Sequence, residues 1–189
     1  MDVDEAIRGR YTADAFDEEA PPRDLIDRLI QTAIWAPNHR LTEPWRFAVI
    51  AGDERARIGD ALAEWLLSDA NPSAPDEDQL AIARSSMLRS PVTVVVVQCG
   101  EPEGGPVRDL EDYAACCCVT QNLMLAAHSE GLASKWVTGR LTRYPPATEL
   151  LGVGEHDRIV AYVRLGYPAE GAAAPERTRT PPAIDWRGM

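Results

Sequence analysis

The segment between Asp112 and Glu130 contains no aspartate, glutamate, lysine or arginine. A helix without a charged face must be buried nearly all round in a globular protein. The polar range Thr120–Asn122 makes the segment unsuited to a membrane span. Gly131 stands where a glycine commonly caps the C-terminus of a helix. The chain is therefore predicted to fold around a central, buried helix.

Four other segments carry strand patterns. Residues 92–97 form a continuous β-branched run after a proline, which favours an interior strand covered on both faces. Residues 158–165 alternate, and the apolar positions predicted to be buried are Ile159, Ala161, Val163 and Leu165. Shorter strands are expected at residues 47–51 and 135–138.

Helical patterns lie between these strands without regular strand–helix alternation. We therefore predict an α+β fold, with a small central mixed β-sheet and helices on both faces. Residues 1–167 are expected to form one domain, and the proline-rich residues 168–189 an extended arm. The predicted further helices cover residues 3–9, the segment from Pro22 to before Pro37, a helix after Gly52-Asp53, residues 76–89, and a short helix from Pro145 to Gly152.

Composition excludes several classes of protein. The 189 residues are 45% hydrophobic and 26% charged, which is ordinary for a globular protein. A net charge of −11 argues against nucleic acid and anionic membranes as partners. No apolar run is long enough to span a membrane, and the acidic N-terminus is unlike a signal peptide. A cytoplasmic location is the resulting expectation.

The four cysteines do not predict a metal site. Cys116, Cys117 and Cys118 are consecutive, and side chains about 100° apart on a helix cannot converge on one ion. Together with Cys99 they are interpreted as small, buried apolar residues. The chain also lacks the glycine-rich fingerprints of dinucleotide-binding and phosphate-binding loops.

Two short segments suggest a ligand site. Residues 36–50 run from the end of a helix through a polar, proline-bounded loop into a strand, and loops of this kind often bind small ligands. In the segment Arg8–Thr12, an arginine and a nearby hydroxyl could bind a phosphate. On local evidence alone, a solvated helix end with Thr12 as a cap is the favoured interpretation of the second segment.

Four pieces of the chain, in order, resemble the nitroreductase family, most closely its compact branch. They are the turn Arg10-Tyr11-Thr12, the loop from Ala36 to Phe47, the buried helix continuing through Gly131 to Gly139, and the strand from Asp157 to Pro168. Together they span nearly the whole chain. The resemblance implies a homodimer with FMN bound at two sites between the subunits.

The resemblance also assigns residues to that site. Arg10, Tyr11 and Thr12 would hold the phosphate and ribityl end, together with Arg179 from the tail. The partner subunit would contribute Trp35, Asn38 and His39 to the flavin, whose ring would be lined by Trp136, Val137, Thr138 and Gly139. No catalytic residue and no metal ligand is assigned.

Two positions depart from the family pattern. Asp14 stands where the family often has a basic residue, and Trp35 stands where the compact branch tends to have arginine. Both departures remove positive charge near a phosphate, so FMN affinity is expected to be modest unless Arg8 and Arg179 compensate. His128 and His156 are interpreted as structural and surface histidines, and Trp45 as a core residue.

The implied activity is electron transfer from NAD(P)H through FMN to a small acceptor such as a nitroaromatic, a quinone or an enone, with ping-pong kinetics. Three alternatives stay open from the sequence. The chain could be a flavin-fragmenting enzyme of the same fold, a non-catalytic FMN-binding protein, or an acidic α+β interaction domain without a cofactor.

Overall fold

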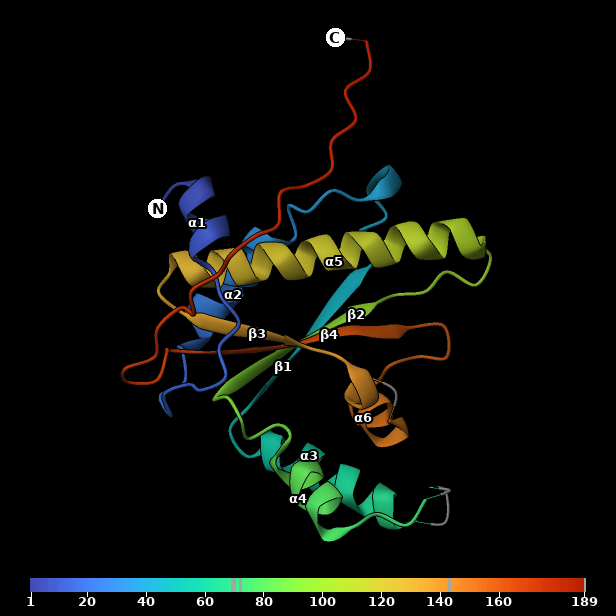
Figure 1. The fold of residues 1–189 in the computed structure, drawn as a ribbon. Coiled ribbons are helices and arrows are strands. Elements are labelled where there is room, and N and C mark those ends of the chain that lie inside the picture. Colours follow the sequence, from blue (N-terminus) through green and yellow to red (C-terminus); the bar gives the residue numbers. More distant parts are fainter. Residues whose placement is uncertain (69–70, 72, 143, 189) are drawn as a thin grey trace.

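The computed structural model describes residues 1–68, 71, 73–142 and 144–188 (Figure 1). Each predicted helix and strand is present, with small shifts at the ends. The first strand begins two residues earlier than predicted, and the helix expected to reach residue 89 ends at Ser85. The helices are α1 (Val3–Gly9), α2 (Arg23–Ala33), α3 (Glu54–Leu67), α4 (Glu77–Ser85), α5 (Gly105–Ser129) and α6 (Pro145–Leu150), with short 3-10 turns at His39–Leu41 and Gly139–Thr142.

The strands are β1 (Trp45–Ala51), β2 (Val92–Gln98), β3 (Ala133–Val137) and β4 (Arg158–Gly166). They form one sheet in the order β1-β2-β4-β3, and each neighbouring pair is antiparallel. The α+β class is confirmed, but the expected mixed sheet is not found in these strands. Parallel pairing in the described residues is confined to an isolated bridge between Thr12 and Ser134. Hydrophobic pattern locates a strand but does not fix its direction, which is why the sequence missed this.

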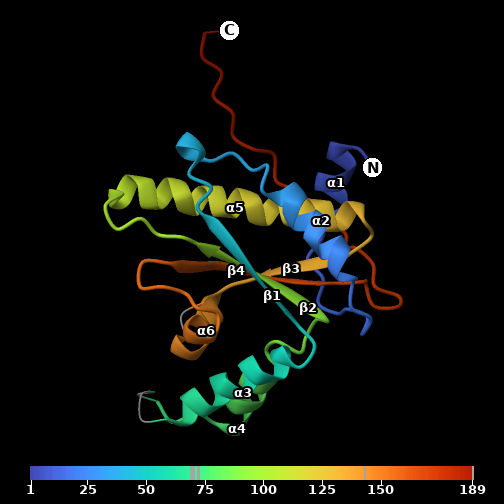
Figure 2. The ribbon, with the colours of Figure 1, turned by 180° about the vertical axis from the view of Figure 1, so that it is seen from behind.

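Helices cover both faces of the sheet, as predicted. The long helix α5 and helix α2 lie on one face, and α3, α4 and α6 lie on the other (Figures 1 and 2). Alternate valines of β2 point into two separate hydrophobic clusters, with Val94 and Val96 facing α5, and Val95 and Val97 facing α3. Strand β4 is also buried on both faces, since Val160 and Tyr162 are buried as well as the four predicted positions.

Helix α5 is less enclosed than its sequence predicts. The side facing the sheet is buried and includes Cys116, Val119 and Leu123. The opposite side is only partly covered within one chain, and Ala114 is exposed. The prediction of burial all round is therefore wrong for the single chain, because the sheet and α2 cover only part of the helix. Gly131 follows the helix with a φ of +79°, a left-handed conformation that suits glycine at this position.

The C-terminal segment leaves the body of the protein as an extended strand of chain. Residues 173–188 contain no helix or strand and are mostly exposed, and Figure 1 shows the end of the chain projecting away beyond α5. Ile184 and Trp186 carry large apolar side chains that are exposed in the single chain. Met189 lies outside the described residues. Among the described helices, none has the length and apolar character that crossing a membrane requires.

Candidate functional site

The turn that follows α1 is fixed against strand β3. Helix α1 begins with a capping box between Asp2 and Glu5 and ends as the chain reaches Arg10. The chain then runs beside β3, where the backbone N–H of Ala13 donates to the carbonyl of Ser134 at 3.1 Å. The predicted phosphate turn therefore lies next to the strand that carries the predicted ring-lining residues.

The C-terminal tail brings further arginines to this turn. The guanidinium of Arg177 donates hydrogen bonds to the carbonyl oxygens of Arg8, Gly9 and Arg10, which fastens the tail to the turn. Burial lowers the pKa of Arg10, and the nearby charges of Arg177 and Arg179 lower it further. Arg179 itself forms no hydrogen bond or ion pair within the described part of the chain. We call Arg10, Arg177 and Arg179 the arginine cluster.

His128, near the end of α5, lies on the inner side of the same turn. A Cβ atom added to Gly9 would lie 2.6 Å from the His128 Nε2 atom, so a larger residue at this position would require the imidazole to move. Burial lowers the pKa of His128, and the charges of Arg10 and Arg177 add to that effect. Both effects favour the neutral form of the imidazole, which lies against Gly9.

Little negative charge offsets the arginine cluster. Asp4 is the carboxylate that lines the adjacent surface cavity, whose volume is about 540 Å³, and its Oδ2 atom accepts a hydrogen bond from Arg8 at 2.7 Å. Arg177 and Arg179 line the same cavity. Because like charges held together are unfavourable unless an anion binds between them, the cavity has the electrostatics of a phosphate site.

The four predicted ring-lining residues occupy the end of β3 and the turn beyond it. The Trp136 side chain packs into the α5-facing cluster, and Val137 packs into the cluster on the opposite face. Thr138 and Gly139 are exposed. The indole N–H of Trp136 is buried and has no hydrogen-bond partner among the described residues. A ligand beside this segment would therefore contact chiefly its exposed end and backbone.

A second basic group stands close to the segment. Lys135, the only lysine of the chain, forms an ion pair with Asp14, and the ion pair lowers the pKa of that carboxyl group. Asp14 occupies the position where a basic residue was expected from the resemblance. Lys135, on strand β3, thus supplies a positive charge beside the position of Asp14, although Asp14 offsets part of that charge.

The polar atoms of the loop between α2 and β1 are largely engaged within the loop. The Asn38 Oδ1 atom accepts from the backbone N–H of Glu43 at 3.0 Å, and Asn38 Nδ2 donates to the carbonyl of Ala36 at 3.3 Å. Thr42 donates to the buried Asp112 on α5 at 2.9 Å. These bonds hold a strained backbone, because Arg40, Leu41 and Glu43 all have positive φ.

The side chains of His39 and Trp35 are exposed and are not held by the hydrogen bonds within the loop. The Nδ1 atom of His39 lies 3.9 Å from a carboxylate oxygen of Glu111 on α5. Trp35 follows α2 and is 87% exposed, and Leu41 is 82% exposed. Large apolar side chains displayed to this extent commonly mark an interaction surface.

His39 and the arginine cluster lie at opposite ends of α5 in one chain. His39 is next to Glu111, whereas the arginine cluster is next to His128, and at 1.5 Å per helical residue these points are about 25 Å apart. Trp35 lies between them, beside Asn122 in the middle of the helix. One chain therefore unites Arg10, Tyr11, Thr12 and Arg179 with the end of β3, but it does not bring His39 to them.

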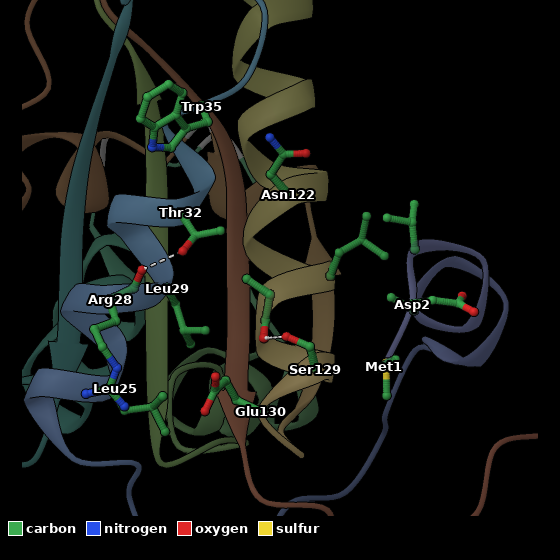
Figure 3. A pocket seen from close by; sticks show the side chains of 14 residues that line it. Met1, Asp2, Leu25, Arg28, Leu29, Thr32, Trp35, Asn122, Ser129 and Glu130 are labelled. Carbon is green, nitrogen blue, oxygen red and sulfur yellow. Dashed lines mark hydrogen bonds between the residues drawn. The ribbon is translucent and has the colours of Figure 1, made fainter.

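A groove lies between α1, α2 and α5 on the partly covered side of the central helix (Figure 3). Its volume is about 520 Å³, and Trp35, Asn122 and Glu130 are among the residues that line it. Asn122 Nδ2 also donates to the carbonyl of Ala33 at 3.3 Å, which ties α5 to the end of α2. The exposed indole of Trp35 stands at one end of this groove.

The cysteines take no part in these arrangements. Cys116 is buried, and burial, together with the neighbouring Cys117, raises the pKa of its thiol to about 12. All four cysteines are free. A buried thiol with a raised pKa is a poor nucleophile, so the core interpretation fits Cys116.

These features define an α+β protein with a cluster of arginines beside a turn at one end of a central helix. The chain belongs to the nitroreductase family, whose family model matches residues 7–167. It is 30% identical over 169 residues to YdjA of Escherichia coli K12, a protein provisionally named as an NAD(P)H nitroreductase, and the match covers 89% of each chain.

Two solved structures share the fold. A nitroreductase-like family protein from Bacillus cereus superposes with a TM-score of 0.82 at 29% identity, covering 96% of this chain and 92% of the other. A nitroreductase from Bacteroides fragilis, solved with bound FMN, gives a TM-score of 0.75 at 25% identity, covering 98% of both chains. The family membership suggested by the four motifs is confirmed.

Sequence reasoning missed two residues of the site. Arg177 was passed over in favour of Arg179, although both lie in the same short arginine- and threonine-containing segment of the tail. Lys135 is the second. It directly precedes the predicted site residue Trp136, and a basic residue at that position, in a chain with the acidic Asp14 at an expected basic position, was the available signal.

Proposed function

We propose that this protein is an FMN-dependent oxidoreductase that passes electrons from NAD(P)H to a small acceptor such as a nitroaromatic, a quinone or an enone. The observation that carries the proposal is the arginine cluster. Arg10 lies near Arg177 and Arg179, the last two line a cavity together with Arg8, and Asp4, the carboxylate among the residues lining that cavity, is hydrogen-bonded by Arg8. A dianionic phosphate is the ligand that this arrangement would favour.

The chemical types of these residues, and their order along the chain, are compatible with an FMN site. Arg10 and Arg179 would hold the phosphate, while Arg177 holds the turn that presents Arg10. Tyr11 and Thr12 follow along β3 toward Thr138 and Gly139, so the ribityl chain and ring would extend in that direction. When bound, FMN would accept a hydride from NAD(P)H and reduce the acceptor in a second half-reaction, which gives ping-pong kinetics.

We further propose that the protein is a homodimer and that each site is completed by the partner. Trp35, Asn38 and His39 would reach the site of the other chain, because His39 lies about 25 Å from the arginine cluster of its own chain. The partly covered side of α5, the groove beside it and the exposed Trp35 and Leu41 supply an apolar surface of the kind that obligate dimers bury. The tail from residue 168 would gain its order on the partner, through Ile184 and Trp186.

The protein's own contribution to the chemistry is positional and electrostatic. Lys135 would place positive charge near the ring, where negative charge develops on reduction, and Asp14 would limit that charge. The exposed backbone of Thr138 and Gly139 would orient the ring. A proton can come from solvent, so the proposal requires no general acid.

Anaerobic titration of the purified protein tests the function. A yellow protein excludes the cofactor-free interaction domain. Bleaching by NADH or NADPH is expected, and parallel double-reciprocal lines should follow when a nitroaromatic or a quinone is varied. A bound flavin that neither nicotinamide reduces would instead indicate a flavin-fragmenting enzyme or a non-catalytic FMN-binding protein. Intersecting lines would contradict a single pocket used in turn by both substrates.

A further inference from the structure

A second arginine-lined pocket lies on the other face of the sheet from α5. It is formed by α3, α4, β4 and the chain before α6, and its volume is about 240 Å³. Leu62, Leu66 and Ile82 give it an apolar wall. Tyr144 also lines it, and the ring of that residue lies 4.9 Å from the ring of Trp65. The interior is therefore suited to a small apolar body.

Two guanidinium groups line the same pocket. Arg164 extends from β4, and its Nη2 atom donates to the carbonyl of Ser86 at 3.0 Å. Arg89 is the second, and neither arginine forms an ion pair with a carboxylate within the described residues. Burial lowers the pKa of Arg164, and Arg89 lowers it further, whereas Asp14 acts in the opposite direction. No carboxylate is among the residues that line the pocket, so the two guanidinium groups give its lining a positive charge, although Arg89 also lines a neighbouring cavity with Asp17 and Glu18.

The pocket also contains a hydroxyl group without a partner. Ser86 is 5% exposed, and its Oγ atom is buried with no hydrogen-bond partner among the described residues. A buried polar atom in that condition costs free energy, and a ligand is one of the few ways to satisfy it. Two guanidinium groups and a free hydroxyl thus surround one apolar pocket.

We propose that this pocket binds a small organic anion, namely a carboxylate carried on a short apolar body. The carboxylate would sit between Arg89 and Arg164 and accept a hydrogen bond from Ser86, and the apolar body would lie against the leucines and Ile82. The volume is below the range of pockets for drug-sized ligands, which limits the occupant to a few carbon atoms beyond the carboxylate. The proposal does not depend on FMN binding or on the proposed reaction.

Calorimetric titration of the full-length protein with hexanoate tests this site. Acetate carries the charge without the apolar body, and 1-hexanol carries the body without the charge, so both are expected to bind at least tenfold more weakly. Arg89→Ala should weaken hexanoate binding by roughly tenfold, the usual result of losing a charge-assisted hydrogen bond. Ser86→Ala should weaken it several-fold and leave the fold intact, because the hydroxyl has no partner to lose.

Two control variants locate the binding. Arg57→Ala removes a surface charge from α3, where Arg57 pairs with Glu54, and should leave hexanoate affinity unchanged. Arg10→Ala should also leave it unchanged. The proposal is overturned if hexanoate does not bind at millimolar concentration, or if Arg89→Ala binds as the parent protein does. It is equally overturned if Arg10→Ala alone reduces the affinity, since the anion then occupies the arginine cluster.

Discussion

The two ends of α5 carry predicted site residues in opposite states. At the C-terminal end, Arg10, Arg177 and Arg179 lie near one another, and none of them forms an ion pair with a carboxylate of the described residues. Near the N-terminal end, Asn38 and Thr42 satisfy the polar groups of their loop and Leu41 is exposed; Trp35, farther along α5 beside Asn122, is exposed as well. The first region is suited to an anion, and the second presents apolar surface.

This difference indicates which kind of partner each region can bind. A charged cluster can be satisfied by a small ligand, whereas a broad apolar surface needs another protein surface. If the partner is a second copy related by a two-fold axis, one association can cover both loops and bring each loop to the other chain's arginine cluster. The predictions below separate the two regions by changing one at a time.

The largest effect is expected from removing the tail. A chain that ends at Pro168 lacks Arg177 and Arg179 and also the apolar residues Ile184 and Trp186. FMN affinity should fall on the order of a thousandfold, because the Arg179 contact to the phosphate is lost together with the Arg177 bonds that hold the turn presenting Arg10, and the dimer should weaken in parallel. Sedimentation and flavin titration of the truncated chain measure both. If it stays dimeric and binds FMN normally, the tail has neither role.

A smaller loss is expected from Arg10→Ala, which alters only the charged region. Loss of one charge-assisted hydrogen bond should lower FMN affinity roughly ten- to a hundredfold without changing the oligomeric state. Arg57→Ala is the matched control, because Arg57 is exposed on α3 and paired with Glu54, and it should leave the affinity unchanged. Equal effects of the two substitutions would mean that general surface charge, and not this cluster, attracts the phosphate.

Asn38→Ala alters only the loop. It removes the acceptor for the Glu43 N–H and should cost about 1 kcal/mol of unfolding free energy, which corresponds to a fall in Tm of about 2–4 °C. Asn38→Asp retains an acceptor oxygen at the same place and should recover most of that stability. Thermal unfolding of the two variants measures this difference in stability. An alanine variant as stable as the parent protein would show that the hydrogen bonds of Asn38 do not hold the loop.

The smallest effect concerns pH and His128. The folded protein holds the pKa of His128 below its usual value, so the unfolded chain takes up the proton first as pH falls. Stability should therefore decrease as pH falls below about 6.5, the unfolded value. His128→Gln should lack this component in urea unfolding at pH 7.0 and 5.5. An unchanged pH dependence would remove His128 from the neighbourhood of the arginine charges.

The sequence predicted the elements of the fold because their signals are local. The charge-free helix, the β-branched run of β2 and the glycine at 131 each follow from residues close together in the chain. Strand direction and the incomplete cover of α5 depend on contacts between distant segments, and pattern alone does not encode them. For the same reason the arginine cluster was only half predicted, since Arg177 acquires its role from carbonyl groups at residues 8–10.

A mixed-dimer experiment tests most directly the claim that each flavin site is shared between two chains. Arg10→Ala is combined in one dimer with a Trp35→Ala/His39→Ala chain, after each variant alone is shown to be dimeric and poor in FMN binding. If each site takes Arg10 from one chain and Trp35 and His39 from the other, all the substitutions fall in one site of the mixed dimer. The other site then carries none. The account predicts that mixing restores one FMN per mixed dimer with parental affinity. Mixed dimers that bind FMN no better than either parent variant would contradict it and place the whole site within one chain.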